Sequence, residues 1–262
     1  MKRSIRTLAL LELPRASLEI SQLLLVSPWL LTTPSGDGHG VFVLPGFAAT
    51  DASTAALRAF LQARGYRTSG WSMGRNFGLR RMGGLDPLLD QYDRFAEKCG
   101  GRISIVGWSM GGVYARQIAM RRADSIRQVI SLGSPINGNP MQTSVWRVYE
   151  NVNGGKISRE AVERFVSNNR LSPNVPATAI YSRTDGVVPW QIAQEPTSRW
   201  SDNIEVSSSH VGLGFNPTVY YLLAERLAQA DGQWRKFDRD HWFHRMILSN
   251  PPASTELEEQ YV

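Results

Sequence analysis

The sequence is poor in the residues that cross-link a chain or bind transition metals. Its 262 residues include one cysteine, Cys99, and four histidines. A single cysteine excludes a disulfide bond within the chain, which is compatible with a reducing compartment. The histidines show no HExxH pattern and no pairing with cysteine. We therefore expect no metal site and no cofactor.

A nucleic-acid motif is also missing, although the chain is basic, with a formal net charge of +6. Such a balance can indicate nucleic acid or an anionic surface as partner. However, the Lys and Arg residues are scattered, in short pairs such as Arg80-Arg81 and Arg121-Arg122, and no zinc-finger spacing accompanies them. The sequence therefore predicts a solvated, mildly basic surface and no nucleic-acid partner.

No apolar run is long enough to span a bilayer, because Ser27-Pro28 breaks the leucine-rich stretch of residues 23–31. The chain begins with basic residues and continues into Leu8–Leu11, as signal peptides do, but Glu12 and Glu19 then interrupt the apolar pattern. We expect residues 1–39 to form a helical segment packed on the core. The alternative is an interfacial anchor that gives weak membrane or lipid-interface association.

The same features favour a cytoplasmic location, with a peripheral membrane protein or a secreted protein as alternatives. The sequence leaves the oligomeric state open.

Short apolar runs alternate with helix-like segments along most of the chain. This spacing predicts βαβ units, a mostly parallel sheet and one α/β domain over residues 40–232. Continuous apolar strands are typical of a sheet that is covered on both faces. The rhythm breaks at about residues 134–176, which we interpret as a small cap or lid, with surface decoration as the alternative. Residues 233–262 form a C-terminal extension.

The most informative segment is Gly107–Gly111, which reads G-x-S-x-G with Ser109 at its centre. An apolar run precedes it, and a stretch with helical periodicity follows it. Strand, sharp turn and helix are the context of a nucleophile elbow, where glycines two residues before and after the serine avoid collisions with the strand and helix. The alternative is a glycine-rich turn without chemistry.

A serine hydroxyl needs a base within hydrogen-bond reach and a carboxylate to orient that base. Asp185 lies in an Asp-Gly pair after a predicted strand, and His210 lies between a short strand and the final helix. Together with Ser109 they give the order serine, acid, histidine. Asp202 is a rival acid but is too close to His210 in the sequence. We expect the other histidines to be structural or solvent-exposed: His39, His241 and His244.

An oxyanion intermediate needs two N–H donors. The amide of Met110 at the start of a helix is one candidate. The other is the amide of Phe47, in the loop after the first central strand, where Gly46 lets the backbone approach a substrate. A simple β-turn at Pro45-Gly46 is the alternative.

These motifs in this order resemble those of the α/β-hydrolase superfamily, in particular its bacterial lipase- and esterase-like members. The resemblance covers roughly residues 40–230. It implies an eight-stranded, mostly parallel sheet flanked by helices and ester hydrolysis through an acyl-enzyme. The matching segments are residues 43–47, 106–112, 132–135, 185–189 and 209–213.

We therefore predict a serine carboxylic-ester hydrolase without a cofactor, acting on a small-molecule ester with an apolar acyl group. Acyl transfer or thioester hydrolysis by the same three residues is the first alternative, and a non-catalytic ligand receptor of the same fold is the second. The apolar side chains of the cap and those beside the serine suit an acyl chain. The candidate pocket residues are Trp108, Trp146, Tyr149 and Phe165.

Overall fold

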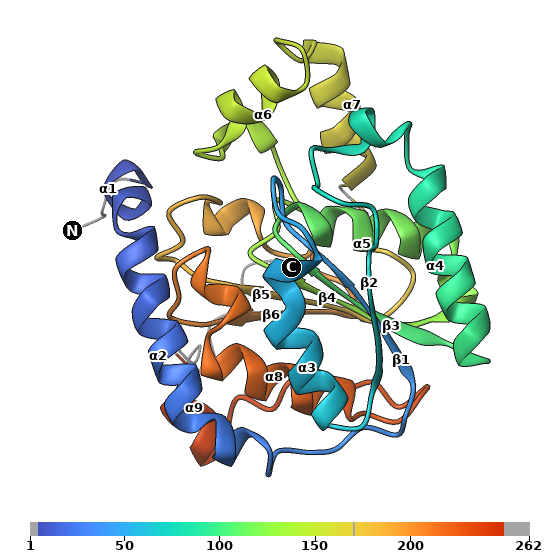
Figure 1. Ribbon diagram of the computed structural model, residues 1–262, viewed down its shortest axis with the longest axis vertical. Coiled ribbons are helices and arrows are strands. Elements are labelled where there is room, and N and C mark those ends of the chain that lie inside the picture. The colour runs from blue at the N-terminus through green and yellow to red at the C-terminus, as the bar shows by residue number, and fades with distance from the viewer. Residues whose placement is uncertain (1–4, 170, 249–262) are drawn as a thin grey trace, which may run out of the picture.

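The computed structural model describes residues 5–169 and 171–248. Its centre is a sheet of six parallel strands in the order β2-β1-β3-β4-β5-β6 (Figure 1). The predicted parallel sheet flanked by helices is confirmed, but the described residues supply six strands and not eight. In the described residues, the chain before β1 and the chain after β6 form helices and irregular segments. Neither part adds a strand to an edge of the sheet. The strands are β1 (Gly40–Leu44), β2 (Arg67–Gly70), β3 (Ile103–Trp108), β4 (Ile126–Leu132), β5 (Ala177–Tyr181) and β6 (Ser201–Glu205).

Both faces of the sheet are buried, because successive side chains of a strand point to opposite faces. In β1, Val41 and Val43 belong to one hydrophobic cluster, and Phe42 and Leu44 belong to another. Two helices cover each face and contribute to the cluster there. The helices on the first face are α3 (Ala55–Ala63) and α8 (Pro217–Leu227), and those on the second are α4 (Asp86–Cys99) and α5 (Met110–Arg121).

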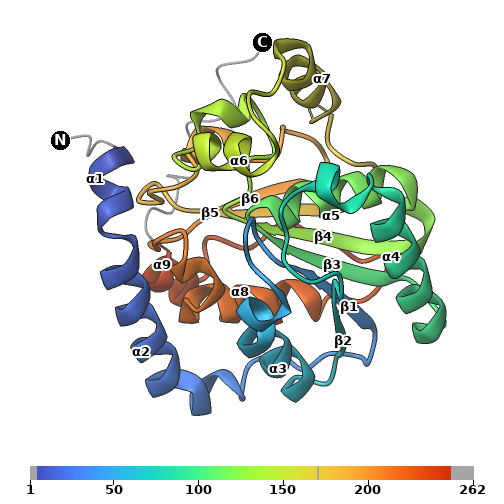
Figure 2. The same ribbon diagram turned by 45° about the horizontal axis from the view of Figure 1, so that its top comes forward.

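The segment between β4 and β5 carries two helices, α6 (Trp146–Val152) and α7 (Arg159–Asn169). Both stand together above α5 and the sheet (Figure 2). Arg116 of α5 forms a buried ion pair with Glu195, which follows β5 in the chain. The same guanidinium donates to the carbonyls of Asn169, at 3.1 Å, and Leu171, at 2.7 Å. The end of α7 is therefore anchored to α5.

Two helices precede the sheet, α1 (Ile5–Leu10) and α2 (Glu12–Leu30). The longer helix, α2, packs against α8 and the loop before it. Its inward side chains are buried and include Glu12 and Glu19, whereas Leu18 and Leu25 on its other side are exposed. In the part of the chain that the structure describes, no helix is long and apolar enough to cross a membrane.

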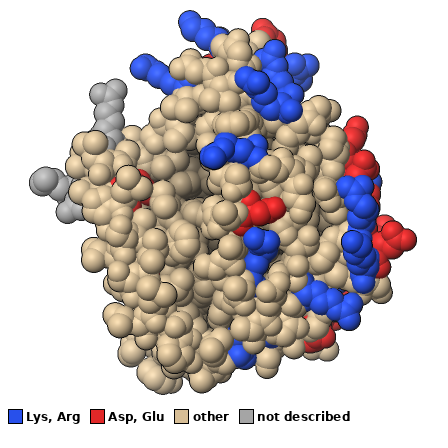
Figure 3. Space-filling model, viewed as in Figure 1, with Lys and Arg blue, Asp and Glu red and all other residues tan. Residues whose placement is uncertain are grey.

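The C-terminal extension contributes α9 (Trp242–Ile247) to the described residues, and residues 249–262 lie outside them. Phe243 of this helix packs against Trp29 of α2, with ring centroids 5.7 Å apart. On the face of the molecule that Figure 3 shows, Lys and Arg side chains stand in separate groups, over the cap and along α4. On this face the basic residues are distributed rather than joined into one patch.

Candidate active site

Ser109 lies at the sharp turn between β3 and α5. Its backbone has φ 55° and ψ −122°, a strained conformation for a residue with a side chain. The turn is held by the Ser109 amide, which donates to the Leu132 carbonyl at 2.8 Å. A Cβ on Gly107 would lie 2.4 Å from the Gly111 backbone, and one on Gly111 would lie 2.3 Å from the Leu44 carbonyl oxygen. The elbow therefore requires both glycines.

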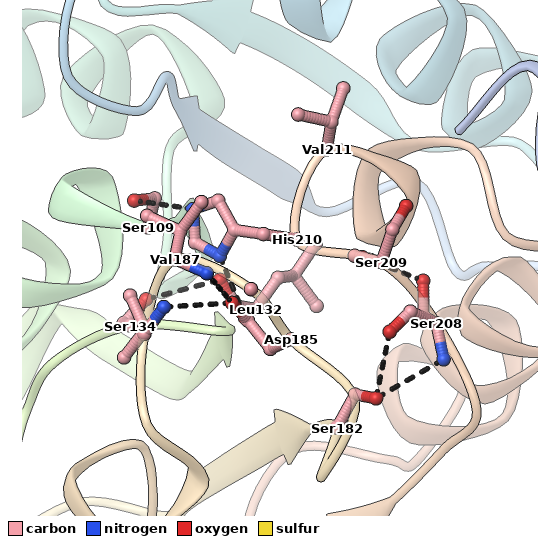
Figure 4. A network of polar contacts seen from close by, with 12 residues as sticks. Ser109, Leu132, Ser134, Ser182, Asp185, Val187, Ser208, Ser209, His210 and Val211 are labelled. Atoms are coloured by element: carbon pink, nitrogen blue, oxygen red, sulfur yellow. Dashed lines mark hydrogen bonds and ion pairs between the residues drawn. The ribbon is translucent and has the colours of Figure 1, made fainter. Parts of the chain in front are cut away.

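The structure brings the three predicted residues together at the carboxyl end of the sheet (Figure 4). His210 Nε2 lies 2.9 Å from Ser109 Oγ, and His210 Nδ1 lies 2.7 Å from Asp185 Oδ2. The other carboxylate oxygen of Asp185 accepts the amides of Val187 and Val188, both at 2.7 Å. A carboxylate fixed in this way holds the imidazole with Nδ1–H toward the acid and leaves Nε2 to accept the serine proton.

Burial and the neighbouring carboxylates have opposite effects on the pKa of His210. Burial lowers the pKa of the imidazole, but the carboxylates of Asp185 and Glu12 oppose this, and the pKa lies above the ordinary value of 6.5. Asp185 and His210 are both almost fully buried, and Ser109 is half-buried. The imidazole is therefore shielded from water, while the Ser109 hydroxyl can still be reached.

The two predicted oxyanion donors lie next to Ser109. Met110 is the first residue of α5, so its amide has no carbonyl of an earlier helical turn to donate to. Phe47 follows Gly46, where a Cβ would lie only 3.1 Å from Ser109 Cβ. Phe47, Ser109 and Met110 all line one cavity. The residues predicted to supply the two oxyanion donors therefore both lie beside Ser109.

A buried asparagine holds this loop in place. Asn76 Nδ2 donates to the Pro45 carbonyl at 2.9 Å, and the Asn76 carbonyl accepts the Ala48 amide at 2.6 Å. Ala48 has φ 59°, a conformation that a non-glycine residue needs support to keep. Sequence reasoning missed Asn76, which lies in an unremarkable loop between β2 and α4 and shows no local pattern.

The cavity beside Ser109 has a volume of about 250 Å³ and is lined mainly by apolar side chains. Three of the four predicted pocket residues line it: Trp146, Tyr149 and Phe165, all from the cap. Sequence analysis overlooked further lining residues on the core side. Among them are Leu79, Val113, Tyr114, Gln117 and Val188.

The prediction that Trp108 lines this pocket is wrong. Its ring packs on the other face of the sheet, in a T-shaped contact with Phe215, with centroids 6.1 Å apart. Its Nε1 donates to the His210 carbonyl at 3.1 Å. Trp108 precedes Ser109 at the end of β3, and Val106, two residues earlier, lies in the cluster under α3 and α8. Strand alternation directs Trp108 to that same face.

Comparisons with known proteins agree with this architecture. A monoacylglycerol lipase of Paleococcus ferrophilus aligns with a TM-score of 0.54 and 14% identity, covering 75% of this chain and 96% of its own. A mature lipase of Bacillus licheniformis aligns with a TM-score of 0.56 and 13% identity, covering 76% and 95%. The chain has the α/β-hydrolase fold.

Another α/β-hydrolase neighbour is a thioesterase domain from the curacin biosynthetic pathway, with a TM-score of 0.50 and 17% identity, covering 75% of this chain and 93% of that domain. The family model of the PGAP1-like alpha/beta domain matches residues 85–198, less than half of the chain. That segment contains Ser109 and Asp185 and ends before His210. No curated protein matches the sequence significantly.

The rival acid and two of the other histidines make contacts away from Ser109. Asp202 accepts the Phe237 amide at 2.7 Å and pairs with Arg239 in the C-terminal extension. His39 is buried between Asp37 and Ser104, and His244 is hydrogen-bonded to Tyr221. Within residues 5–169 and 171–248, no group of three His, Cys, Asp or Glu side chains is arranged to hold a metal ion.

Glu12 and Glu19 are the other residues that sequence reasoning missed. Read in the sequence, they only interrupt an apolar run. In the structure both carboxylates reach the loop that carries His210. The available signal was their spacing of two helical turns, which places two acids on one face of an otherwise apolar helix.

Proposed function

We propose that the protein hydrolyses carboxylic esters with apolar acyl groups through an acyl-enzyme on Ser109. The observation that carries the proposal is the continuous set of short contacts from Asp185 through His210 to Ser109 at the mouth of an apolar cavity. This geometry supports proton transfer from the hydroxyl to Nε2 as the hydroxyl attacks.

In the first half-reaction, His210 Nε2 takes the Ser109 proton while Oγ bonds to the ester carbonyl carbon. The carbonyl oxygen becomes an oxyanion that accepts from the Phe47 and Met110 amides. The imidazolium then gives its proton to the alkoxy oxygen, and the carbon–oxygen bond of the ester breaks. The alcohol leaves, and the acyl group remains on Ser109.

In the second half-reaction, His210 removes a proton from water and the resulting hydroxide attacks the acyl carbon. The same two amides donate hydrogen bonds to the new oxyanion. His210 returns its proton to Ser109 Oγ as the acyl bond to the serine breaks, and the carboxylic acid is released. Each proton that the histidine takes is returned, so the cycle needs no cofactor.

The cavity supports an apolar acyl group rather than a charged one. The cap presents Trp146, Tyr149 and Phe165 to it, and α5 presents Val113. None of these side chains offers a positive charge, and burying an unpaired anion among them would cost several kcal/mol. Apolar side chains with a few polar groups at one end are typical of pockets for apolar ligands.

The proposal is tested with a series of p-nitrophenyl esters from acetyl to palmitoyl and with a fluorophosphonate probe that labels activated serines. Ser109→Ala should remove labelling and lower kcat by at least about 10⁴-fold, because it removes the hydroxyl that lies 2.9 Å from His210 Nε2. Ser69→Ala, which changes a half-buried serine in β2, should behave as the wild type.

Two results would redirect the assignment. Faster turnover of acyl thioesters, or transfer to added alcohols, would favour the thioesterase or acyltransferase that shares this chemistry. A wild-type protein that neither labels nor hydrolyses any of these esters would indicate a ligand receptor with an inactive site.

A further inference from the structure

Two buried carboxylates of α2 contact the loop that carries His210. Glu12 Oε1 accepts the His210 amide at 3.0 Å and the Gly186 amide at 2.8 Å, and Glu12 Oε2 accepts the Val211 amide at 2.9 Å. One side chain thus binds the backbone on both sides of the histidine and the residue after Asp185. Without this carboxylate, the amides of these loop residues would face water.

Glu19, two turns further along α2, binds the residue before the histidine. Its Oε1 accepts the Ser209 amide at 2.9 Å, and its Oε2 accepts the Ser209 hydroxyl. Ser209 Oγ in turn accepts the Gly212 amide at 2.9 Å. The amides of residues 209–211 are therefore held by acceptors that lie 190 or more residues earlier in the chain, and Gly212 is held through Ser209. Figure 4 shows Ser209 and Val211 on either side of His210.

The packing around these contacts is close. A Cβ on Gly212 would lie 1.5 Å from Glu19 Oε2, and one on Gly186 would lie 2.5 Å from the backbone of Ala9. Arg15 of α2 also donates to the Thr184 hydroxyl at 2.7 Å, next to Asp185. The start of α2 therefore touches the acid loop and the histidine loop at the same time.

Stability alone does not account for this arrangement. Moving a carboxylate out of water costs several kcal/mol, and its hydrogen bonds offset that cost without a large net gain. Glu12 and Glu19 are 5% and 7% exposed, in a helix that otherwise buries apolar side chains against the core. Their common feature is that both bind backbone within one residue of His210.

We infer that Glu12 and Glu19 are positioning residues, which hold His210 where its imidazole meets both Ser109 and Asp185. The inference rests on the proposed function, because it assigns a role within the ester-hydrolysing site. The carboxylate of Glu12 has a second effect, since its negative charge contributes to the raised pKa of His210.

The test compares Glu12→Gln, Glu19→Gln and Glu12→Asp with Ser17→Ala, an exposed position of the same helix. The measurements are kcat/KM across pH, the rate of fluorophosphonate labelling, and the His210 pKa from NMR of the ¹⁵N-histidine-labelled protein. Glu12→Gln turns an amide N–H toward the Val211 N–H and removes the charge. It should lower kcat/KM by about 10- to 100-fold and lower the His210 pKa.

Glu12→Asp keeps the charge but is too short to reach all three amides, so it should lower kcat/KM while the His210 pKa stays near the wild-type value. Glu19→Gln should also slow the reaction, with less change in that pKa. Ser17→Ala should match the wild type in all three measurements.

The inference is overturned if the glutamine variants lose thermal stability but label at the wild-type rate per folded molecule. An unchanged His210 pKa in Glu12→Gln would contradict the electrostatic part in the same way. Failure of the proposed function gives a different result, because then the wild type itself neither labels nor hydrolyses esters.

Discussion

The indole of Trp108 donates a hydrogen bond of 3.1 Å to the backbone carbonyl of His210. The residue before the proposed nucleophile thus binds the residue proposed as its base, from the face of the sheet opposite the cavity. Trp108 also packs edge-on against Phe215. Together with Glu12, which binds the amide of the same histidine, it fixes both the backbone N–H and the backbone carbonyl of His210.

Trp108→Phe should therefore slow ester hydrolysis by about fivefold, the effect of losing roughly 1 kcal/mol of hydrogen bonding. The phenyl ring keeps part of the packing but has no N–H to donate. The measurement is kcat on a short-chain ester. Tyr92→Phe is the control, since it removes a buried bond to the Ser125 carbonyl at a site remote from the cavity. Equal losses of rate in both variants would refute a local role for Trp108.

The central strands and the elbow could be predicted from sequence because their signals are local. A strand buried on both faces gives an apolar run, as residues 40–44 do, and the structure has β1 over Gly40–Leu44. The glycines around Ser109 are required by contacts within the elbow and with the adjacent strand, so they appear as a short motif. The order of Ser109, Asp185 and His210 follows from the order of the strands.

The direction of Trp108 could have been predicted and was not. Alternation along β3 places it on the face of Val106, away from Met110, which packs against the cluster on the other face. Its apolar side chain and its place next to Ser109 suggested a pocket residue. The number of strands could not be predicted in that way. Eight strands were implied by the resemblance and not by the residues, and the described sheet has six.

The spacing of Glu12 and Glu19 places both on one face of α2, but no sequence signal shows which backbone Glu12 or Asn76 contacts. Glu12 binds a loop 198 residues away, and Asn76 binds one 31 residues away. Hydrogen bonds from a side chain to a remote backbone impose no periodicity and no motif. Only the fold shows which loop such a side chain reaches.

Asn76→Leu should impair the oxyanion loop more than the overall fold. Leucine has similar volume but cannot donate to the Pro45 carbonyl or accept the Gly78 amide. We expect kcat to fall by about 10- to 100-fold, because a misplaced donor loses much of its effect on the oxyanion, while KM changes little.

A matched comparison is Asn139→Ala, which removes an exposed amide interaction in the cap and should leave kcat unchanged. Full kcat in Asn76→Leu would mean that the loop around Phe47 keeps its shape without the asparagine.

The activity should increase with pH through a pKa above 6.5, because protonated His210 cannot accept the Ser109 proton and its pKa is raised. The carboxylate of Asp185 stabilises the imidazolium, so Asp185→Asn should lower this pKa and move the acidic limb of kcat/KM to lower pH. It should also reduce kcat by about 10⁴-fold. Asp202→Asn is the control: its carboxylate contacts the C-terminal extension, and the limb should stay in place. A limb that moves to higher pH in Asp185→Asn would contradict this account.

The size of the cavity should determine which acyl chains are accepted. Phe165→Ala removes an aromatic ring from the lining and should favour longer acyl chains, whereas Ala161→Phe fills part of the same space and should favour shorter ones. Both side chains belong to α7, and Val166 on that helix does not line the cavity, so Val166→Ala should keep the wild-type profile. The measurement is kcat/KM across the p-nitrophenyl ester series. Because the acetyl group reaches little beyond Ser109, its rate should change least. Opposite shifts of the preferred acyl length in Phe165→Ala and Ala161→Phe would establish the cap as the acyl-binding surface. Equal losses of kcat/KM at every chain length would show that the cap acts through stability instead.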